Sequence, residues 1–181
     1  MRVIAAFART GLMTLTLGAA LAASSRAQAP EKHEHTAGPV NQQKDLRIEA
    51  EPGKVTTLKP EAIAKLPRLS VKVNDHGKET VFEGVKLAEV LKLSGVDFSE
   101  AAKGKRLRSY LVAEAADKYS VVYALIELDP EFTDNVVILA DKRDGQPLPE
   151  QARYWQIVNP EEKRAGRWVR QVVNLKVVTV K

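Results

Sequence analysis

The chain has 181 residues, with a hydrophobic content of 44%, a charged content of 28% and a formal net charge of +5. This length suits one domain with a tail, and the hydrophobic content is sufficient for a packed core. The absence of cysteine excludes disulfides, a cysteine nucleophile, a thiolate metal ligand and dithiol redox chemistry.

Residues 1–29 have the pattern of a secretory signal peptide. Arg2 and Arg9 give a positive beginning, and an uncharged, largely apolar run follows at residues 11–23. The tripeptide Ala27-Gln28-Ala29 is a small-x-small cleavage site. The apolar run is shorter than the ~20 residues that a membrane-spanning helix needs, so we expect no membrane span after cleavage. The sequence therefore predicts a periplasmic or secreted protein.

Cleavage would change the charge balance of the chain. The segment 1–29 contains three arginines and no acidic residue, so the mature chain keeps 25 Lys and Arg against 23 Asp and Glu, a net charge of +2. No sustained basic tract is mixed with aromatic residues. The sequence therefore indicates no nucleic-acid partner.

Residues 30–45 are polar and lack periodicity, and we expect them to form a flexible linker before a single domain at residues 46–181. The linker carries His33 and His35, which could contact a metal loosely. Two solvated histidines are the favoured interpretation, because a specific metal site needs more ligands on rigid elements.

The first part of the domain is predicted to contain short strands and one turn of helix. Hydrophobic alternation and the positions of two prolines predict strands at residues 46–50, 55–58, 69–74 and 78–82, and a helical turn at residues 60–66. The last two strands should form a hairpin around Asn74-Asp75-His76-Gly77. His76 is either an acid or base at a pocket edge or an exposed turn residue, and we favour the second interpretation.

A short helix is predicted after this hairpin, and the rest of the domain can pack around it. A strand end and a tight turn at Gly84 should precede the helix. Leu87, Val90 and Leu91 are spaced to share one helix face. Gly95 is placed to end the helix in a left-handed conformation.

The second part of the domain is richer in strands. Ser99 can cap a helical turn that ends at Gly104, and residues 125–128 suit another helical turn. Strands are predicted at residues 107–113, 119–124, 136–140, 154–158 and 172–180. The apolar run 136–140 is typical of a strand that is buried on both faces. We therefore predict an α+β fold, mixed and strand-rich, with two or three short helices.

Five short motifs follow one another along the domain. Residues 82–96 combine an extended aromatic, Gly-Val, two turns of helix and a second Gly-Val, and Asp117-Lys118-Tyr119-Ser120 forms a turn. The third motif, at residues 136–148, is an apolar strand followed by Asp-Gly-Gln-Pro-Leu. The fourth is a strand that ends in Ile-Val-Asn-Pro at residues 157–160, and the fifth is a last strand segment that begins with Val-Arg at residues 169–178. In this order the set resembles the sulfite oxidase-like family, that is, the oxidoreductase molybdopterin-binding domain.

The resemblance implies a sulfite oxidase-like fold, and three departures from it bear on function. Enzymes of this family hold molybdenum through a dithiolene pterin and one protein Cys, which lies in the segment that corresponds to residues 71–78. That segment has no Cys, and neither Val73 nor Asn74 can replace a soft thiolate. An Arg of the family appears here as Gln156, and a Lys appears as Arg170, which keeps the charge but changes the shape.

These departures favour a non-catalytic binding module over an enzyme. The expected ligand is a small anion or a periplasmic protein partner, bound where the family holds pterin and substrate. The candidate ligand-binding residues are Asn74, Tyr119, Ser120, Arg143, Arg153 and Arg170. We predict no catalytic residue, no metal site and no cofactor, although the resemblance implies that molybdopterin could bind. The alternative is a molybdopterin-dependent oxidoreductase of the sulfite oxidase type.

Two further functional interpretations receive less support from the sequence. Tyr154, Trp155 and Trp168 could contact a partner, but tyrosine and tryptophan side chains more often bury large areas in a core. A hydrolase would have only His76 as a base outside the linker, and no Ser-His-Asp arrangement can be argued. No Gly-rich nucleotide-binding loop is present.

Overall fold

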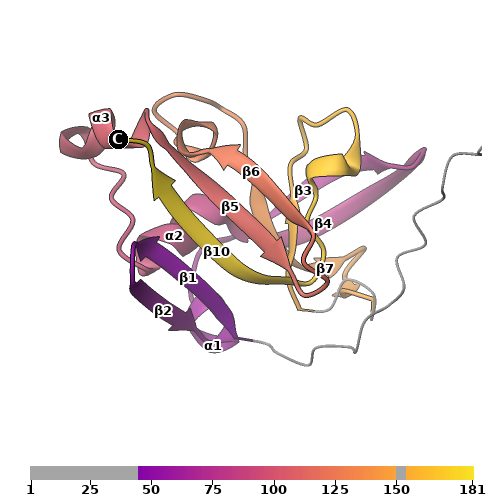
Figure 1. Cartoon of the computed structure of the whole chain (residues 1–181). Coiled ribbons are helices and arrows are strands. Elements are labelled where there is room, and N and C mark those ends of the chain that lie inside the picture. The colour runs from indigo at the N-terminus through magenta and orange to yellow at the C-terminus, as the bar shows by residue number, and fades with distance from the viewer. Residues whose placement is uncertain (1–44, 150–153) are drawn as a thin grey trace, which may run out of the picture. The chain divides into compact units, whose positions relative to one another are not determined.

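The computed structural model describes residues 45–149 and 154–181, so the predicted signal peptide, His33 and His35 lie outside the described residues. Ten strands in this part of the chain form two sheets of five strands. The first sheet has the order β2-β1-β10-β5-β6, from β1 (Leu46–Glu51), β2 (Lys54–Leu58), β5 (Ser109–Ala115), β6 (Ser120–Ala124) and β10 (Val172–Thr179). Figure 1 shows this sheet in front of the second.

The second sheet contains the predicted hairpin. Its order is β3-β4-β7-β8, and β9 also pairs with β7. The strands are β3 (Arg68–Asp75), β4 (Lys78–Lys86), β7 (Ile138–Arg143), β8 (Gln146–Pro147) and β9 (Gln156–Val158). Every pairing in both sheets is antiparallel except that of β1 with β10, which joins the two ends of the domain in parallel.

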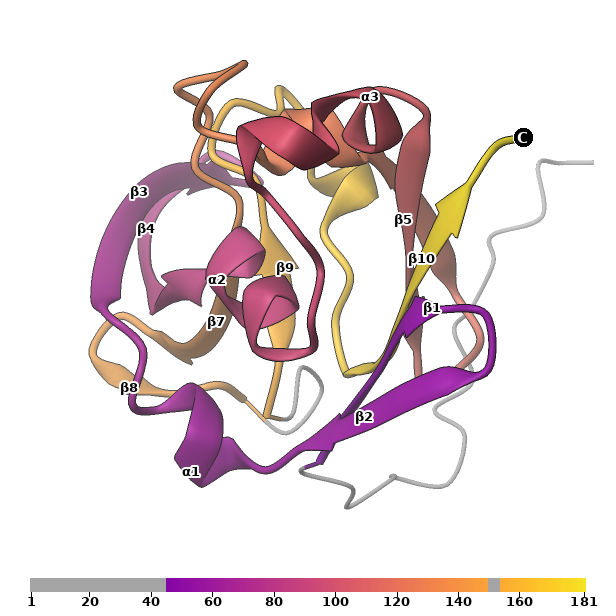
Figure 2. The same cartoon turned by 90° about the vertical axis from the view of Figure 1, so that its left-hand side faces the viewer.

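Short helical segments connect the strands. Within residues 45–149 and 154–181, three are α-helical, α1 (Pro60–Ile63), α2 (Leu87–Leu93) and α3 (Lys103–Arg106), and three are 3-10 helices, η1 (Glu100–Ala102), η2 (Leu125–Leu128) and η3 (Ala165–Arg167). Figure 2 shows α2 in the space between the two sheets. The prediction of a strand-rich α+β fold with short helices is confirmed. No helix among the described residues is long and apolar enough to cross a bilayer.

The main core lies where α2 meets the inner faces of both sheets. Along β5, Leu111, Ala113 and Ala115 are buried while the residues between them are partly exposed, as expected for a strand with one buried face. Leu87 and Leu91 of α2 are fully buried in the same cluster. A helix of seven residues cannot persist alone in water, so this burial holds it in place.

The first half of β7, in the second sheet, is buried on both faces. Leu139 of β7 enters the main core, whereas Ile138 and Ala140 pack into a smaller cluster with Phe82 and Trp168. The Phe82 and Trp168 rings meet edge to face, with centroids 5.7 Å apart. The prediction that residues 136–140 contribute a strand buried on both faces is confirmed, although β7 runs from Ile138 to Arg143.

The predicted turn at Gly84 is wrong, because β4 continues through this residue to Lys86. A bulge in the pairing with β7 falls between Glu83 and Gly84. A Cβ atom at Gly84 would lie 2.1 Å from the carbonyl oxygen of Leu139 and 2.6 Å from the Cα of Ala140. Glycine is needed here for close approach of two backbones rather than for a turn.

Two glycines near helix ends behave differently. Gly95 follows α2 with a φ of +91°, and the N–H of Val96 donates to the carbonyl of Leu91 at 3.2 Å, which confirms the predicted helix end. The prediction that Gly104 ends a helical turn is wrong, because Gly104 lies inside α3. The helix is extended to Arg106, whose buried side chain makes tertiary contacts that outweigh the low helix propensity of glycine.

Candidate functional site

A pocket of about 450 Å³ lies between two irregular walls. One wall is η2 with the loop that follows it, and the other is the loop from β9 to η3. The lining residues are Ile126, Glu127, Phe132, Thr133, Asn135, Asn159, Glu161, Glu162 and Arg167. The lining is mostly polar, and Ile126 and Phe132 are its apolar side chains.

Arg167 joins the two walls of the pocket. Its Nη2 donates to Oε2 of Glu127 at 2.5 Å, and its Nε lies 3.3 Å from Oε1 of Glu162 as an ion pair without hydrogen-bond alignment. The guanidinium also lies 4.5 Å from the centre of the Tyr123 ring. Burial by itself lowers the pKa of Arg167, but the hydrogen bond to Glu127 and the nearby carboxylates raise the pKa overall.

Strand β6 supports the wall that contains η3. The hydroxyl of Tyr123 donates to the carbonyl of Arg167, and the hydroxyl of Tyr119 donates to the carbonyl of Gly166. Burial raises the pKa of Tyr123 well above its usual range, so this hydroxyl stays protonated and remains a donor. Tyr119, directly before β6, and Tyr123, within β6, therefore fix the backbone carbonyls of Gly166 and Arg167.

Asn159 organises the start of the same loop. Its side-chain Oδ1 accepts from the N–H of Glu161 at 3.1 Å, and its Nδ2 donates to Oε1 of Glu162 at 3.3 Å. Its backbone carbonyl accepts from the indole N–H of Trp168 at 3.0 Å. These bonds turn the chain sharply after β9 and bring Glu161 and Glu162 to the pocket.

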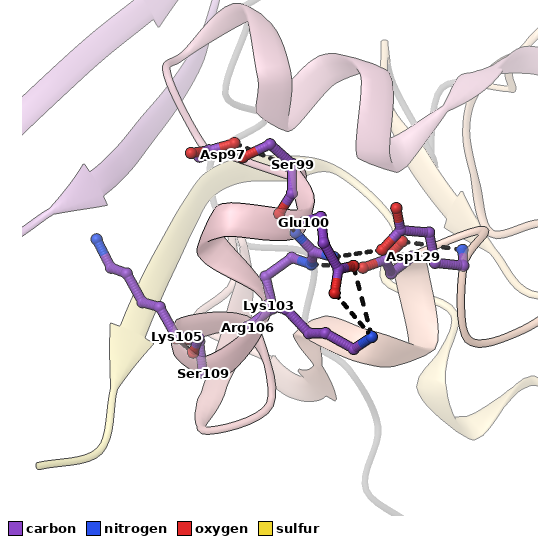
Figure 3. Close-up of polar contacts among 9 residues, drawn as sticks. Asp97, Ser99, Glu100, Lys103, Lys105, Arg106, Ser109 and Asp129 are labelled. Carbon is purple, nitrogen blue, oxygen red and sulfur yellow. Dashed lines mark hydrogen bonds and ion pairs between the residues drawn. The ribbon is translucent and has the colours of Figure 1, made fainter.

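A buried ion pair anchors the opposite wall (Figure 3). Nε of Arg106 lies 2.5 Å from Oδ2 of Asp129, and each side chain is only 1% exposed. Arg106 also donates from Nη2 to Glu131 at 2.7 Å and from Nη1 to the carbonyl of Ser99. Because loss of one partner would leave an uncompensated buried charge, this pair commits the loop after η2 to one position.

The electrostatic character of the pocket is acidic. Its described lining holds three glutamates and one arginine, and that arginine is paired with Glu127 and Glu162. The carboxylate of Glu161 is exposed and has no partner among the described residues. Oδ1 of Asn135 is buried without a hydrogen-bond donor. The pocket therefore offers more acceptors than donors.

Two of the predicted ligand-binding residues lie near the tip of the β3–β4 hairpin. Asn74 uses its Oδ1 to accept from the N–H of Gly77 at 2.6 Å, which closes the turn. Arg143 donates from Nη2 toward the buried Asp75 carboxylate at 3.0 Å. The other oxygen of Asp75 lies 2.6 Å from Nδ1 of His76, a side chain that is 77% exposed and lines no described pocket.

The remaining predicted residues are dispersed. Tyr119 reaches η3 as described, and Oγ of Ser120 donates to the carbonyl of Lys118 at 3.2 Å. Arg170 is exposed and joins Gln156 through a backbone bridge. Arg153 lies outside the described residues. None of the described candidates lines the acidic pocket, so the predicted convergence of cationic side chains is not seen there.

Sequence reasoning missed the residues that build the pocket. Glu127, Asn159, Glu162 and Arg167 come from segments far apart in the chain and form no spaced motif. The available clues were local: an asparagine after a strand end, and an arginine next to Trp168. The two tryptophans themselves are core residues, with Trp155 4% and Trp168 6% exposed, so the core interpretation is confirmed.

The donor set does not fit the metal centre that the resemblance implies. Residues 71–78 form the end of β3, a two-residue turn and the start of β4, and the whole chain has no Cys. Among the described residues, no three His, Cys, Asp or Glu side chains are grouped to hold a metal ion. A dithiolene-bound metal would therefore have no thiolate from this chain.

Comparison with known proteins places the fold. No protein-family model matches the chain, and no curated protein matches its sequence. Among solved structures it is similar to the sulfane dehydrogenase SoxCD from Paracoccus pantotrophus, with a TM-score of 0.59 and 17% identity. The match covers 77% of this chain but only 40% of the SoxCD chain. The chain thus has a sulfite oxidase-like α+β fold, related to that structure at a distance.

Proposed function

We propose that this chain is an exported, non-catalytic binding module that uses a sulfite oxidase-like fold to present a ligand pocket. The observation that carries the proposal is the pocket whose walls are held by Arg106 and Arg167. Its polar side chains are oriented by ion pairs and hydrogen bonds within the walls, an arrangement that suits recognition. Export rests on the signal-peptide pattern of residues 1–29.

We propose that the chain is not catalytic because residues 71–78 offer no thiolate to a metal. At the position that corresponds to the family's thiolate, the chain has a closed turn in which Asn74 binds Gly77 and Asp75 binds Arg143. Molybdopterin could still bind through hydrogen bonds and charge, but such binding would be weaker and reversible without a bond from the metal to the protein.

A molybdopterin-dependent oxidoreductase is the second candidate, favoured by the structural similarity to SoxCD. The full chain can be produced in a periplasm with the molybdopterin pathway active, then analysed for molybdenum and assayed for sulfite oxidation with an artificial electron acceptor. We expect neither stoichiometric metal nor turnover. Stoichiometric molybdenum with turnover that falls on Arg170→Ala would overturn the proposed function.

A small anion, the ligand expected from the sequence, is proposed to bind at Arg170 rather than in the acidic pocket. Arg170 supports this, because it is exposed and its guanidinium has no partner among the described residues. Amide chemical-shift changes on titration with sulfite should be lost in Arg170→Ala. Changes that persist unaltered in this variant would rule out Arg170 as the anion site.

A further inference from the structure

Strand β6 forms one edge of the first sheet, because it pairs with β5 on one side and with no described strand on the other. Figure 1 shows β10, β5 and β6 side by side. The N–H of Ala115 donates to the carbonyl of Tyr119 at 2.9 Å, so these two residues form a hydrogen-bonded pair. Such pairs alternate with non-hydrogen-bonded pairs in an antiparallel ladder. The backbone N–H and C=O groups of Ser120 and Val122 therefore point to the open edge.

The edge at β6 lacks the charged residues that usually protect a free edge. Its sequence is Ser-Val-Val-Tyr-Ala, and the side chains on the outer face are Ser120, Val122 and Ala124. Val122 is 54% exposed. The other long edge strands in the described part of the chain carry cations, Lys54 in β2 and Lys72 in β3. An open, uncharged edge with high β-propensity favours pairing with a further strand, and natural proteins usually cover or charge such an edge.

The sequence narrows the choice of the covering strand. Residues 30–44, which precede β1, contain two prolines and only one apolar β-branched residue, Val40, so they are poorly suited to join a sheet. The edges of β2 and β3 would place Lys54 or Lys72 against an uncharged surface. A second copy of β6 matches this edge without burying a charge.

We propose that two copies of this chain pair through β6 in antiparallel orientation, about a two-fold axis at Val122, so that their first sheets form one continuous sheet. In this register the two Val122 backbones exchange reciprocal hydrogen bonds, and Ser120 lies opposite the partner's Ala124. The contact is isologous and closes at two copies, because the other edge of the sheet is the charged strand β2.

Apolar side chains on the outer face of the sheet extend this contact. Val112 lies opposite Val122, and Tyr110 lies between Ala124 and Val178. Val112, Tyr110 and Val178 are each partly exposed. The two valines at the two-fold axis would share a face and shield each other, as directly opposite residues of a sheet do. One pair of short edge strands buries less than the about 1,600 Å² of a standard interface, so we expect a weak dimer.

The test follows the molar mass of the full chain after export as a function of concentration. Sedimentation velocity and light scattering between about 1 μM and about 1 mM cover the range of weak association. The unmodified chain should change from monomer to dimer in this range and form no larger species. A chain that stays monomeric up to about 1 mM would overturn the proposal and leave the β6 edge for a strand of another protein.

A charge at the two-fold axis should prevent the pairing. Val122→Lys places two like charges directly opposite each other and should raise the dissociation constant about tenfold or more. Its melting temperature as a monomer should stay close to that of the unmodified chain, because the side chain is exposed. Val55→Lys is the matched control, since Val55 is an exposed valine on β2, the opposite edge of the same sheet. Equal loss of association in the two variants would show that β6 is not the interface.

A mixture of two variants tests the register. Val122→Glu should associate as poorly as Val122→Lys, because each variant by itself sets like charges opposite each other. Mixed at low ionic strength, the two variants should form a heterodimer, because the opposite charges then meet at the axis. Failure of the mixture to associate, or association of either variant alone as strongly as the unmodified chain, would overturn the pairing at Val122.

Discussion

At the scale of single residues, two arginines hold the pocket walls by different means. Arg106 is fully buried against Asp129, so its contribution lies in committing the loop to one position. Arg167 is partly exposed and bridges Glu127 and Glu162, so solvent screens its ion pairs. We infer that the first wall is rigid and that the second depends more on Tyr119 and Tyr123 than on charge.

Gly84→Ala should destabilise the protein by about 3 kcal/mol or more, because the new Cβ would overlap the backbone of Leu139. Backbone atoms cannot rotate away from such an overlap as a flexible side chain can. Gly104→Ala is the matched control. It lies within α3 with open space around the added Cβ, and it should stabilise by about 0.5–1 kcal/mol. Urea unfolding measures both. Equal effects of the two substitutions would contradict the proposed close approach of β4 and β7.

Tyr123→Phe should alter the loss of stability at alkaline pH. The folded-state pKa of Tyr123 is raised by burial, so the unfolded chain loses this proton first, near the ordinary tyrosine pKa of about 10. The contribution of Tyr123 to stability is therefore complete below pH 10 and is lost progressively above it. Urea midpoints between pH 8 and 11 should fall less steeply in the variant. An identical slope in both proteins would show that Tyr123 ionises normally in the folded state.

At the scale of elements, α2 is short and depends on the face that it buries. Its cap through Gly95 and the exposed pair of Glu89 with Lys92 at 2.8 Å contribute little beside the burial of Leu87 and Leu91. Because α2 lies between the sheets, a cavity beneath it weakens the contacts of both sheets (Figure 2).

Leu91→Ala should therefore cost about 2–5 kcal/mol of unfolding free energy, the range for truncation of a fully buried leucine. Lys92→Ala, one position along the same helix, should cost less than about 1 kcal/mol, since the lysine is exposed and its ion pair is screened. Chemical denaturation of the two variants gives the comparison. A large effect of Lys92→Ala would mean that the solvent-facing side of α2 carries an unrecognised contact.

At the scale of the whole molecule, the first and last strands of the domain, β1 and β10, are neighbours in one sheet. Pairing of β1 with β10 ties the first and last strands of the domain together, so shortening the C-terminus by one strand should unfold the first sheet.

The mature protein is predicted to begin at Pro30. Mass spectrometry of protein recovered from the periplasm should show the loss of residues 1–29, because Ala27-Gln28-Ala29 follows an uncharged apolar run. Replacing Ala27 and Ala29 with larger residues should retain the leader on the membrane fraction. A cytoplasmic product of full length in the unmodified chain would contradict export.

Local rules were sufficient for much of the fold. The helix face of Leu87, Val90 and Leu91, the left-handed Gly95 and the hairpin around residues 74–77 depend on residues close in sequence, and the structure confirms each. The turn itself is shorter than predicted, because β3 continues to Asp75 and leaves only His76 and Gly77 between the strands. The two errors, at Gly84 and Gly104, share a cause. In both cases a glycine was assigned from local propensity, while a distant segment decided its conformation, β7 for the first and the Asp129 loop for the second.

The sequence by itself determined the strand-rich α+β class, the leader pattern and the absence of any thiolate, because these depend on periodicity and composition. Only the tertiary structure decided which polar residues form a pocket. Glu127, Asn135, Glu161 and Arg167 meet because β6 and β9 deliver their loops to the same place, with Tyr123 and the Arg106–Asp129 pair fixing the walls. Such contacts between distant segments depend on packing of the whole chain, and no spacing along the sequence encodes them.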